Sequence, residues 1–172
     1  MPDATGLELI AQRVREQVAD EAVTGTEYAR EQATLQVTPE RVHDVLAYLR
    51  EAEEPWGCLM SLHGCDYLPD EPRLGVHYQL LSMDRCDRLN VKTRLGVEDP
   101  RLPTVVDLFP TADFQEREVY DMFGVYFEGH PDMRRILMPE DYEGFPQRRD
   151  FPVGGEPVIF TFSERKYPRW YD

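Results

Sequence analysis

Residues 116–124 read EREVYDMFG, and residues 129–137 read GHPDMRRIL. The sequence continues without interruption as MPEDYEGFPQRRDFP over residues 138–152. This stretch mixes charged, aromatic, glycine and proline residues more densely than the packing of an ordinary core requires. It is therefore the part of the chain from which fold and role can best be inferred.

The stretch begins on a predicted helix over residues 112–123. Thr111 is placed to cap its first turn and Gly124 to end it, because threonine favours N-caps and glycine favours the residue after a helix. Toward the N-terminus, apolar residues at helical spacing predict a helix over residues 5–20. A second helix is expected to begin at Pro39, with Thr38 as its N-cap, and to stop at Glu54-Pro55.

Other segments alternate apolar and polar residues, as strands with one wet face do. The pattern predicts a first strand over residues 27–37 and three more over residues 56–67, 74–83 and 87–96. Short turns between the last three favour an antiparallel arrangement. Residues 103–109 are expected to form a short helical turn. The predicted fold class is α+β, with helices packed on one face of a mostly antiparallel sheet.

Residues 125–172 differ from this body, because they are rich in proline, glycine and aromatic residues and show little periodicity. Such a segment cannot build its own core, yet its aromatic content is too high for a disordered linker. We therefore expect an α+β domain over residues 1–124 and an irregular, extended interaction arm over residues 125–172. The arm is expected to order against a neighbouring surface.

The composition limits what the chain can bind. Its 172 residues include 19 Lys plus Arg against 33 Asp plus Glu, which gives a formal net charge of -14. This acidity disfavours binding to nucleic acid or to anionic lipid. No apolar run approaches the ~20 residues that span a membrane, and the N-terminus lacks the charge pattern of a secretory signal. We expect a soluble cytoplasmic protein without direct membrane contact.

The three cysteines, Cys58, Cys65 and Cys86, form neither a CxxC pair nor an even set for disulfides. His63 and Cys65 can share a strand face, but a zinc or iron–sulfur site normally uses about four ligands. We therefore expect free thiols in a reducing compartment and no metal in this chain.

Glu116, Glu118 and Asp121 are the carboxylates that acid–base catalysis would use. No nucleophile, phosphate-binding loop or ordered triad accompanies them. Arg117 and Asp121 lie four residues apart on the predicted helix, where they can pair with each other, so structural ion pairing is favoured over catalysis. His130 is expected to hold a turn through a ring-nitrogen hydrogen bond rather than to carry protons.

Two arginine pairs interrupt the acidity of the arm, Arg134-Arg135 and Arg148-Arg149. Guanidinium groups form bidentate pairs with carboxylates and are enriched at protein interfaces. Alternatively, they pair in part with the arm's own acids, which are Glu140, Asp141, Glu143 and Asp150. The arm also carries aromatic residues typical of binding hot spots: Phe145, Phe151, Phe160, Phe162, Trp170 and Tyr171. Together these residues favour a permanent protein–protein interface.

The same stretch resembles a known family. Its Glu-Arg-Glu triplet is followed by an acid three residues on, two bulky apolar residues, a histidine and a basic–apolar ending. This pattern resembles the signature of the 30 kDa subunit family, the C subunits, of respiratory complex I (NADH-quinone oxidoreductase). The motif and interface residues marked in this way are Glu116, Arg117, Glu118, Asp121, Phe123, Gly124, His130, Arg134, Arg135, Arg148, Arg149 and Asp150.

The resemblance implies a non-catalytic, hydrophilic subunit of a proton-pumping oxidoreductase on the cytoplasmic side of the cell membrane. Such a protein would hold no cofactor, since FMN, iron–sulfur clusters and quinone would be bound by its partners in the complex. It would clamp chiefly the D subunit, and then contact the B and I subunits. The arm, with its arginines and aromatic residues, would lie along the D subunit.

Three alternatives stay open. The first is a homologous subunit of an energy-converting membrane-bound hydrogenase or hydrogenlyase, since nothing in the sequence selects the electron donor. The second is a free-standing hydrolase that uses Glu116, Glu118 and His130. The third is a monomeric binding module whose arm packs on its own domain.

Overall fold

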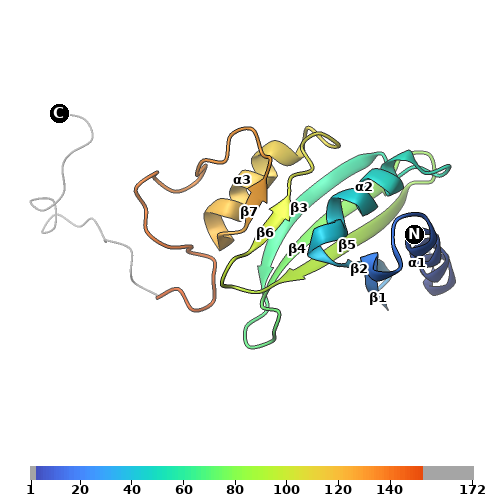
Figure 1. The fold of residues 1–172 in the computed structure, drawn as a ribbon, viewed down its shortest axis with the longest axis horizontal. Helices are drawn as coiled ribbons and strands as arrows, with labels where there is room; N and C mark the ends of the chain where they lie inside the picture. The colour runs from blue at the N-terminus through green and yellow to red at the C-terminus, as the bar shows by residue number, and fades with distance from the viewer. Residues whose placement is uncertain (1–2, 153–172) are drawn as a thin grey trace, which may run out of the picture.

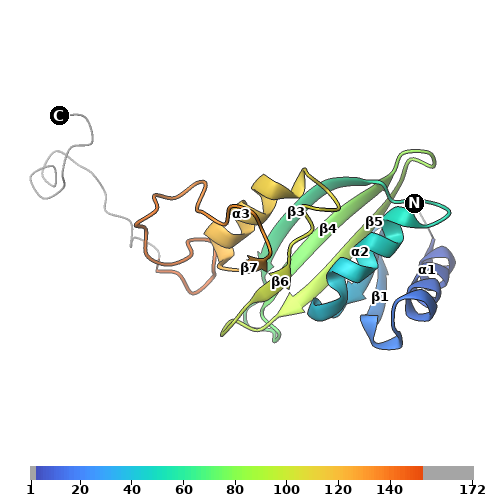
Figure 2. The same cartoon turned by 45° about the horizontal axis from the view of Figure 1, so that its top comes forward.

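The computed structural model describes residues 3–152. They form an α+β fold of two layers, in which three helices lie on one face of a five-stranded sheet (Figure 1). No helix of the described chain lies on the other face, as a view turned by 45° also shows (Figure 2). The predicted fold class is confirmed.

The sheet contains β1 (Val23–Ala29), β2 (Gln32–Val37), β3 (Cys58–Asp66), β4 (Leu74–Ser82) and β5 (Asp87–Leu95). Their order is β1-β2-β5-β4-β3, and all neighbours are antiparallel except β2 and β5, which are parallel. The predicted antiparallel meander is β3–β4–β5. Alternate residues of these strands, such as Val76, Tyr78 and Leu80 of β4, are fully buried beneath the helices.

Two helices cover the middle and one end of this core. Helix α1 (Ala4–Gln17) starts at Asp3, whose side chain accepts a hydrogen bond from Gly6 N–H at 2.7 Å. A 3₁₀ turn (Asp20–Ala22) leads into β1, and another (Pro39–Arg41) leads into α2 (Val42–Glu51). Both helices bury one apolar face, because their apolar residues recur every three or four positions.

The third helix, α3 (Ala112–Phe123), packs against the edge strand β3. It is flanked by two short parallel strands, β6 (Arg101–Pro103) and β7 (Tyr126–Glu128). Contact with β3 is close at Gly64, where a Cβ would lie 2.5 Å from the Phe123 ring. Gly124 ends α3 with φ of 77°, a left-handed conformation that glycine adopts without strain.

Two local predictions were wrong. Residues 27–37 form parts of two strands rather than one, because Arg30 and Glu31 take positive φ values of 52° and 62° and reverse the chain. Thr111 does not cap α3: its hydroxyl points to Leu59 O at 3.5 Å instead. The strands β6 and β7 were not predicted, since three residues are too few to show a period.

The described part of the arm, residues 125–152, lies against the domain. Val125 and Phe127 are buried, and β7 pairs with β6. The division of the chain at residue 124 stays a prediction, and residues 153–172, including Phe160, Phe162, Trp170 and Tyr171, lie outside the described residues.

Candidate functional site

The motif occupies α3 and the segment that runs back over it. Helix α3 turns Glu116 and Asp121 inward, where neither is exposed to solvent, and turns Phe114 and Glu118 outward. Buried carboxylates need hydrogen-bond donors to compensate for lost hydration. The hydrogen-bond donors around Glu116 and Asp121 show which segment each carboxylate holds in place.

Asp121 fixes the segment that follows the histidine. Its Oδ2 accepts hydrogen bonds from the backbone N–H groups of Ile136, Leu137 and Met138 at 3.0, 2.7 and 2.8 Å. Its Oδ1 accepts one from Arg135 Nη1 at 2.7 Å. Burial alone would raise the pKa of Asp121, but these hydrogen bonds outweigh it, so the pKa lies below its usual value. A charged carboxylate therefore holds residues 135–138 against α3.

Arg135 extends this anchor to the next part of the arm. It also donates to Asp121 O at 3.2 Å and to Gly144 O at 3.0 Å. Its guanidinium lies 5.4 Å from the centre of the Phe145 ring and 5.8 Å from that of Tyr142. One arginine thus ties α3 to the turn around residue 144.

Glu116 holds the opposite end of α3 to the loop after β6. Its Oε2 accepts from the Thr104 hydroxyl at 2.6 Å, and its Oε1 accepts from Val105 N–H at 2.8 Å. Burial raises the pKa of Glu116 to about 7 despite these two donors. With no cation within reach of an ion pair in the described chain, this carboxyl titrates near neutrality.

His130 closes the turn after β7. Its Nδ1 accepts a hydrogen bond from Asp132 N–H at 3.0 Å, so the proton of the neutral ring sits on Nε2, which donates to Asp113 O at 3.2 Å. Its side chain is fully buried. The prediction that His130 holds a turn through its ring nitrogens is confirmed.

Outward from these anchors lie five exposed residues, here called the α3–arm surface: Phe114, Glu118, Arg134, Ile136 and Leu137. Arg117 joins its two halves, since it lies over the Phe114 ring and donates to the carbonyls of Arg134 and Arg135. Phe114 and Leu137 are 62% and 61% exposed. Glu118 is exposed and has no ionic or hydrogen-bond partner among residues 3–152.

A second attachment secures the end of the described arm. Arg73 forms bidentate contacts with two carboxylates: Asp66 at 2.8 and 2.5 Å, and Asp150 at 2.8 and 2.7 Å. Hydrogen bonds from Arg73, with help from the Arg149 N–H, lower the pKa of Asp66 far below its usual value. Asp66 and Arg73 escaped the sequence analysis, because no local pattern links residue 73 to residue 150.

The arginines of the two predicted pairs have different hydrogen-bond partners. Arg134 is exposed and pairs with Asp132 at 2.6 and 2.7 Å. Arg148 donates to Phe123 O at 2.7 Å and lies over the Phe145 ring, and Arg149 donates to Leu68 O at 2.7 Å. Pairing with Glu140, Asp141 or Glu143 does not occur within the described chain, and Asp150 pairs with Arg73 instead.

The predicted Arg117–Asp121 pair was also wrong. Asp121 is pulled into the interior by three backbone N–H groups, while Arg117 reaches toward carbonyls on the surface. The structure thus brings Glu116, Asp121, Phe123, Gly124, His130 and Arg135 together as the support of the site. Glu118 and Arg134 are exposed, and Arg134 is paired with Asp132. Among residues 3–152 no group of three or more His, Cys, Asp or Glu is placed to hold a metal ion.

Comparison with known proteins gives concordant results. The sequence pattern that defines the family "Respiratory-chain NADH dehydrogenase, 30 Kd subunit" matches residues 35–157. The C subunit of NADH-quinone oxidoreductase from Roseiflexus sp. (strain RS-1) is 42% identical over 156 residues, which are 90% of this chain and 89% of that protein. The protein of the same name from Salinispora arenicola (strain CNS-205) is 45% identical over 146 residues, 84% of this chain. The chain spans about 60% of the length of the two Salinispora relatives.

Two solved structures are similar. One is "Nqo5 of the trypsin-resistant fragment (1-134) in P63 form", with 35% identity and a TM-score of 0.61 over 72% of this chain and 98% of that one. The other belongs to the membrane-bound sulfane sulfur reductase, "an archaeal respiratory membrane complex", with 27% identity and a TM-score of 0.68 over 95% of this chain and 91% of that one. By motif, family match and fold, the chain belongs to the 30 kDa subunit family of respiratory-chain NADH dehydrogenase.

Proposed function

We propose that this chain is the C subunit of a proton-pumping NADH-quinone oxidoreductase and acts as an accessory scaffold in its quinone-reducing part. The observation that carries the proposal is the Asp121 anchor. There the buried, charged carboxylate of Asp121 accepts four hydrogen bonds. Three come from the backbone N–H groups of residues 136–138, and one comes from the side chain of Arg135. A catalytic carboxylate needs access to substrate, which Asp121 at zero exposure lacks.

The anchor gives the α3–arm surface a fixed shape before any partner arrives. Ordering a flexible segment at the moment of binding weakens association, so a segment already fixed by Asp121 and Arg135 binds with less entropy loss. The exposed Phe114 and Leu137 supply apolar contact area, and Glu118 and Arg134 supply charges at its edge. This mixture suits a permanent protein partner.

We assign this surface to the D subunit, with the B and I subunits as further neighbours. The chain itself then binds no cofactor, and FMN, iron–sulfur clusters and quinone belong to its partners in the complex. Within the described chain, no helix has both the length and the apolar character needed to cross a bilayer. From the resemblance to the C subunits of complex I, we place the chain on the cytoplasmic side of the membrane, held there through its partners.

A second candidate has its own support. The matching chain of the membrane-bound sulfane sulfur reductase covers 95% of this chain with a TM-score of 0.68 and 27% identity. A protein of this fold therefore also serves a respiratory complex of another name. The alternative is a related membrane complex, such as an energy-converting hydrogenase, in which the same scaffold supports a different electron donor.

The test is purification of the tagged chain from its own cells in mild detergent, followed by mass spectrometry of the proteins that come with it. Recovery of the D subunit together with flavin- and cluster-bearing NADH-oxidising subunits is the expected result. Recovery of a D-like protein with a hydrogenase or a sulfur reductase would replace the first candidate with the second. Recovery of the chain alone would refute both.

A further inference from the structure

The face of the five-stranded sheet opposite the helices carries a cluster of cations that the proposed function does not use. Strand register places Arg88, Lys92 and Arg94 of β5 on this face, beside His77 of β4 and His63 of β3. Within the five strands, the acidic residue that register places there is Glu27, on the edge strand β1. This positive face contrasts with the chain's net charge of -14.

These cations lack partners of opposite charge. Arg88, Lys92 and Arg94 form no ion pair within residues 3–152. Arg94 donates through Nε to Pro72 O at 2.7 Å, but its Nη2 is buried without a hydrogen-bond partner in the described chain.

The cluster is also held in place. The Tyr67 ring lies over Gly75, where a Cβ would come within 2.5 Å of it, and so covers the end of the sheet face. The Lys92 ammonium and the Arg94 guanidinium both lie over this ring, at 4.6 and 4.1 Å from its centre. Cation–π contact restricts two long side chains that would otherwise move freely in water. Such preorganisation favours binding to a partner.

Two partly buried histidines lie beside these cations. His63 and His77 stack with ring centres 5.1 Å apart, and Tyr67 OH lies 2.7 Å from His77 Nε2. Burial, with His63 and Lys92 nearby, lowers the pKa of His77 to about 4. Both rings are therefore neutral at physiological pH and act as hydrogen-bonding groups beside the cations.

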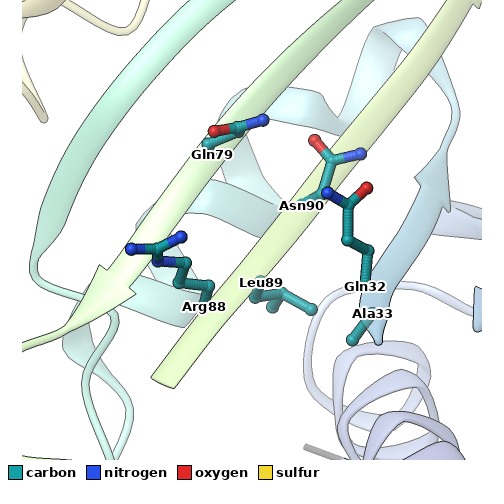
Figure 3. Close-up of a pocket in the computed structure, with 6 residues that line it drawn as sticks. All are labelled: Gln32, Ala33, Gln79, Arg88, Leu89 and Asn90. Atoms are coloured by element: carbon teal, nitrogen blue, oxygen red, sulfur yellow. The ribbon is translucent and has the colours of Figure 1, made fainter. Parts of the chain in front are cut away.

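Next to the cations the face is hollowed. Figure 3 shows Gln79, Arg88, Asn90 and Gln32, which come from three neighbouring strands, around a hollow of 70 Å³. This volume is about that of two water molecules in the liquid, enough for the tip of one side chain. Asn90 Oδ1 is buried there without a partner among the described residues.

We propose that this open face is a second docking surface, distinct from the α3–arm surface, and that its occupant is an acidic segment of another protein. Charge complementarity selects the occupant, since carboxylates supply the acceptors that Arg88, Lys92 and Arg94 lack. The five strands are six to nine residues long. At a spacing of about 4.8 Å they span roughly 19 by 27 Å, or about 500 Å². That is somewhat more than half of the ~800 Å² that each partner buries in a standard interface.

Other polyanions fit the chemistry less well. A nucleic acid or an anionic membrane would bring the remaining, acidic surface of the chain close to many negative charges. The chain's own residues 153–172 carry Glu156, Glu164 and Asp172 against Arg165, Lys166 and Arg169, and so offer no net negative charge. An acidic protein segment presents its carboxylates locally and avoids this repulsion.

The test uses the full chain and fluorescein-labelled decaglutamate, with binding followed by fluorescence anisotropy. The double variant Arg88→Gln/Lys92→Gln is compared with the matched control Arg13→Gln/Arg15→Gln, which removes the same charge from α1. The sheet-face variant is expected to bind about tenfold more weakly, and the control within about twofold of wild type. Equal weakening by both variants, or no binding by wild type, would overturn the proposal.

Three further measurements test the location of the binding site, the kind of occupant and the independence of the two surfaces. Amide NMR shifts of the wild type on adding decaglutamate should concentrate on β3, β4 and β5, which tests the site without any substitution. Decathymidylate and vesicles of 30% phosphatidylglycerol are the competing probes, and tighter binding of either than of the peptide would contradict a protein occupant. Arg134→Ala, on the α3–arm surface, should leave decaglutamate binding unchanged. The docking surface proposed here can therefore be refuted without refuting the proposed function, and the reverse also holds.

Discussion

Asp121 and Arg135, fourteen positions apart, form a buried ion pair in which Arg135 Nη1 lies 2.7 Å from Asp121 Oδ1. The other carboxylate oxygen of Asp121 accepts three backbone N–H groups of the same segment. The pair therefore joins α3 to the arm, and the shape of the α3–arm surface depends on it. Its contribution can be measured directly.

Replacement of Asp121 by Asn should loosen the arm and destabilise the protein. The amide oxygen can still accept the three N–H groups, but the amide nitrogen then faces Arg135, and a buried charge loses its partner. Breaking a buried ion pair in this way costs about 3–5 kcal/mol. Urea unfolding measures the loss, and faster hydrogen exchange at residues 136–138 locates it. Glu118→Gln, on the exposed side of the same helix, should change stability by less than about 0.5 kcal/mol.

Glu116 should give the stability of the protein a measurable pH dependence. Its pKa is raised from 4.5 to about 7, so the folded state holds the proton more tightly than the unfolded state. The stabilisation is complete below pH 4.5 and is lost as pH rises through 7. Glu116→Gln cannot ionise, so relative to wild type it should gain stability between about pH 5 and 8, by up to about 3 kcal/mol. Denaturation at several pH values measures the free energy of unfolding of both proteins. If the difference between wild type and Glu116→Gln stays constant over this range, Glu116 does not titrate as described.

Gly124 should tolerate no side chain. Alanine there must adopt φ of 77°, and its Cβ would lie 2.5 Å from the Phe145 ring. Gly129 provides the matched control, with φ of 84° but an open site whose nearest atom is Thr104 Cγ2 at 3.4 Å. Both alanine variants should lose about 1 kcal/mol to backbone strain. Gly124→Ala should lose clearly more in thermal unfolding, because Phe145 must also move.

Arg134→Ala should weaken assembly without weakening the fold. Arg134 and Asp132 form an exposed pair, and such pairs contribute about 0–1 kcal/mol to stability. Arg101, also exposed and paired with an exposed carboxylate, Asp99, is the matched control. We expect less of the D subunit to co-purify with Arg134→Ala than with Arg101→Ala, at equal melting temperature. Arg149→Ala should also reduce co-purification, although its hydrogen bond to Leu68 O adds a local cost. Equal recovery of the D subunit with Arg134→Ala and Arg101→Ala would show that Arg134 does not belong to the interface.

Sequence pattern predicted the regular parts of this fold for identifiable reasons. Helix α3 could be predicted because Gly124 is placed to end it. The β3–β4–β5 meander could be predicted because β5 alternates apolar and polar residues and the connections between the strands are short. The division between β1 and β2 could not be predicted, because Arg30 and Glu31 turn the chain without glycine or proline. Tertiary contacts, rather than local preference, decide such turns.

The motif residues could be named from the sequence, but their partners could not. Spacing on a helix favoured Arg117 as the partner of Asp121, whereas three backbone donors from residues 136–138 decided the outcome. The Arg73 contacts with Asp66 and Asp150 span up to 77 positions. The cations of the open face were equally hidden, because their clustering depends on strand order rather than on sequence order.

The central claim is that the α3–arm surface faces the D subunit. The sharpest test places the photoreactive residue p-benzoylphenylalanine at Phe114, 62% exposed, and a control copy at Leu9 of α1, 52% exposed. Irradiation of the assembled complex, followed by mass spectrometry, should yield a cross-link to the D subunit from position 114 and none from position 9. Cross-links to the D subunit from position 9 alone, or from neither position in an intact complex, would contradict this assignment.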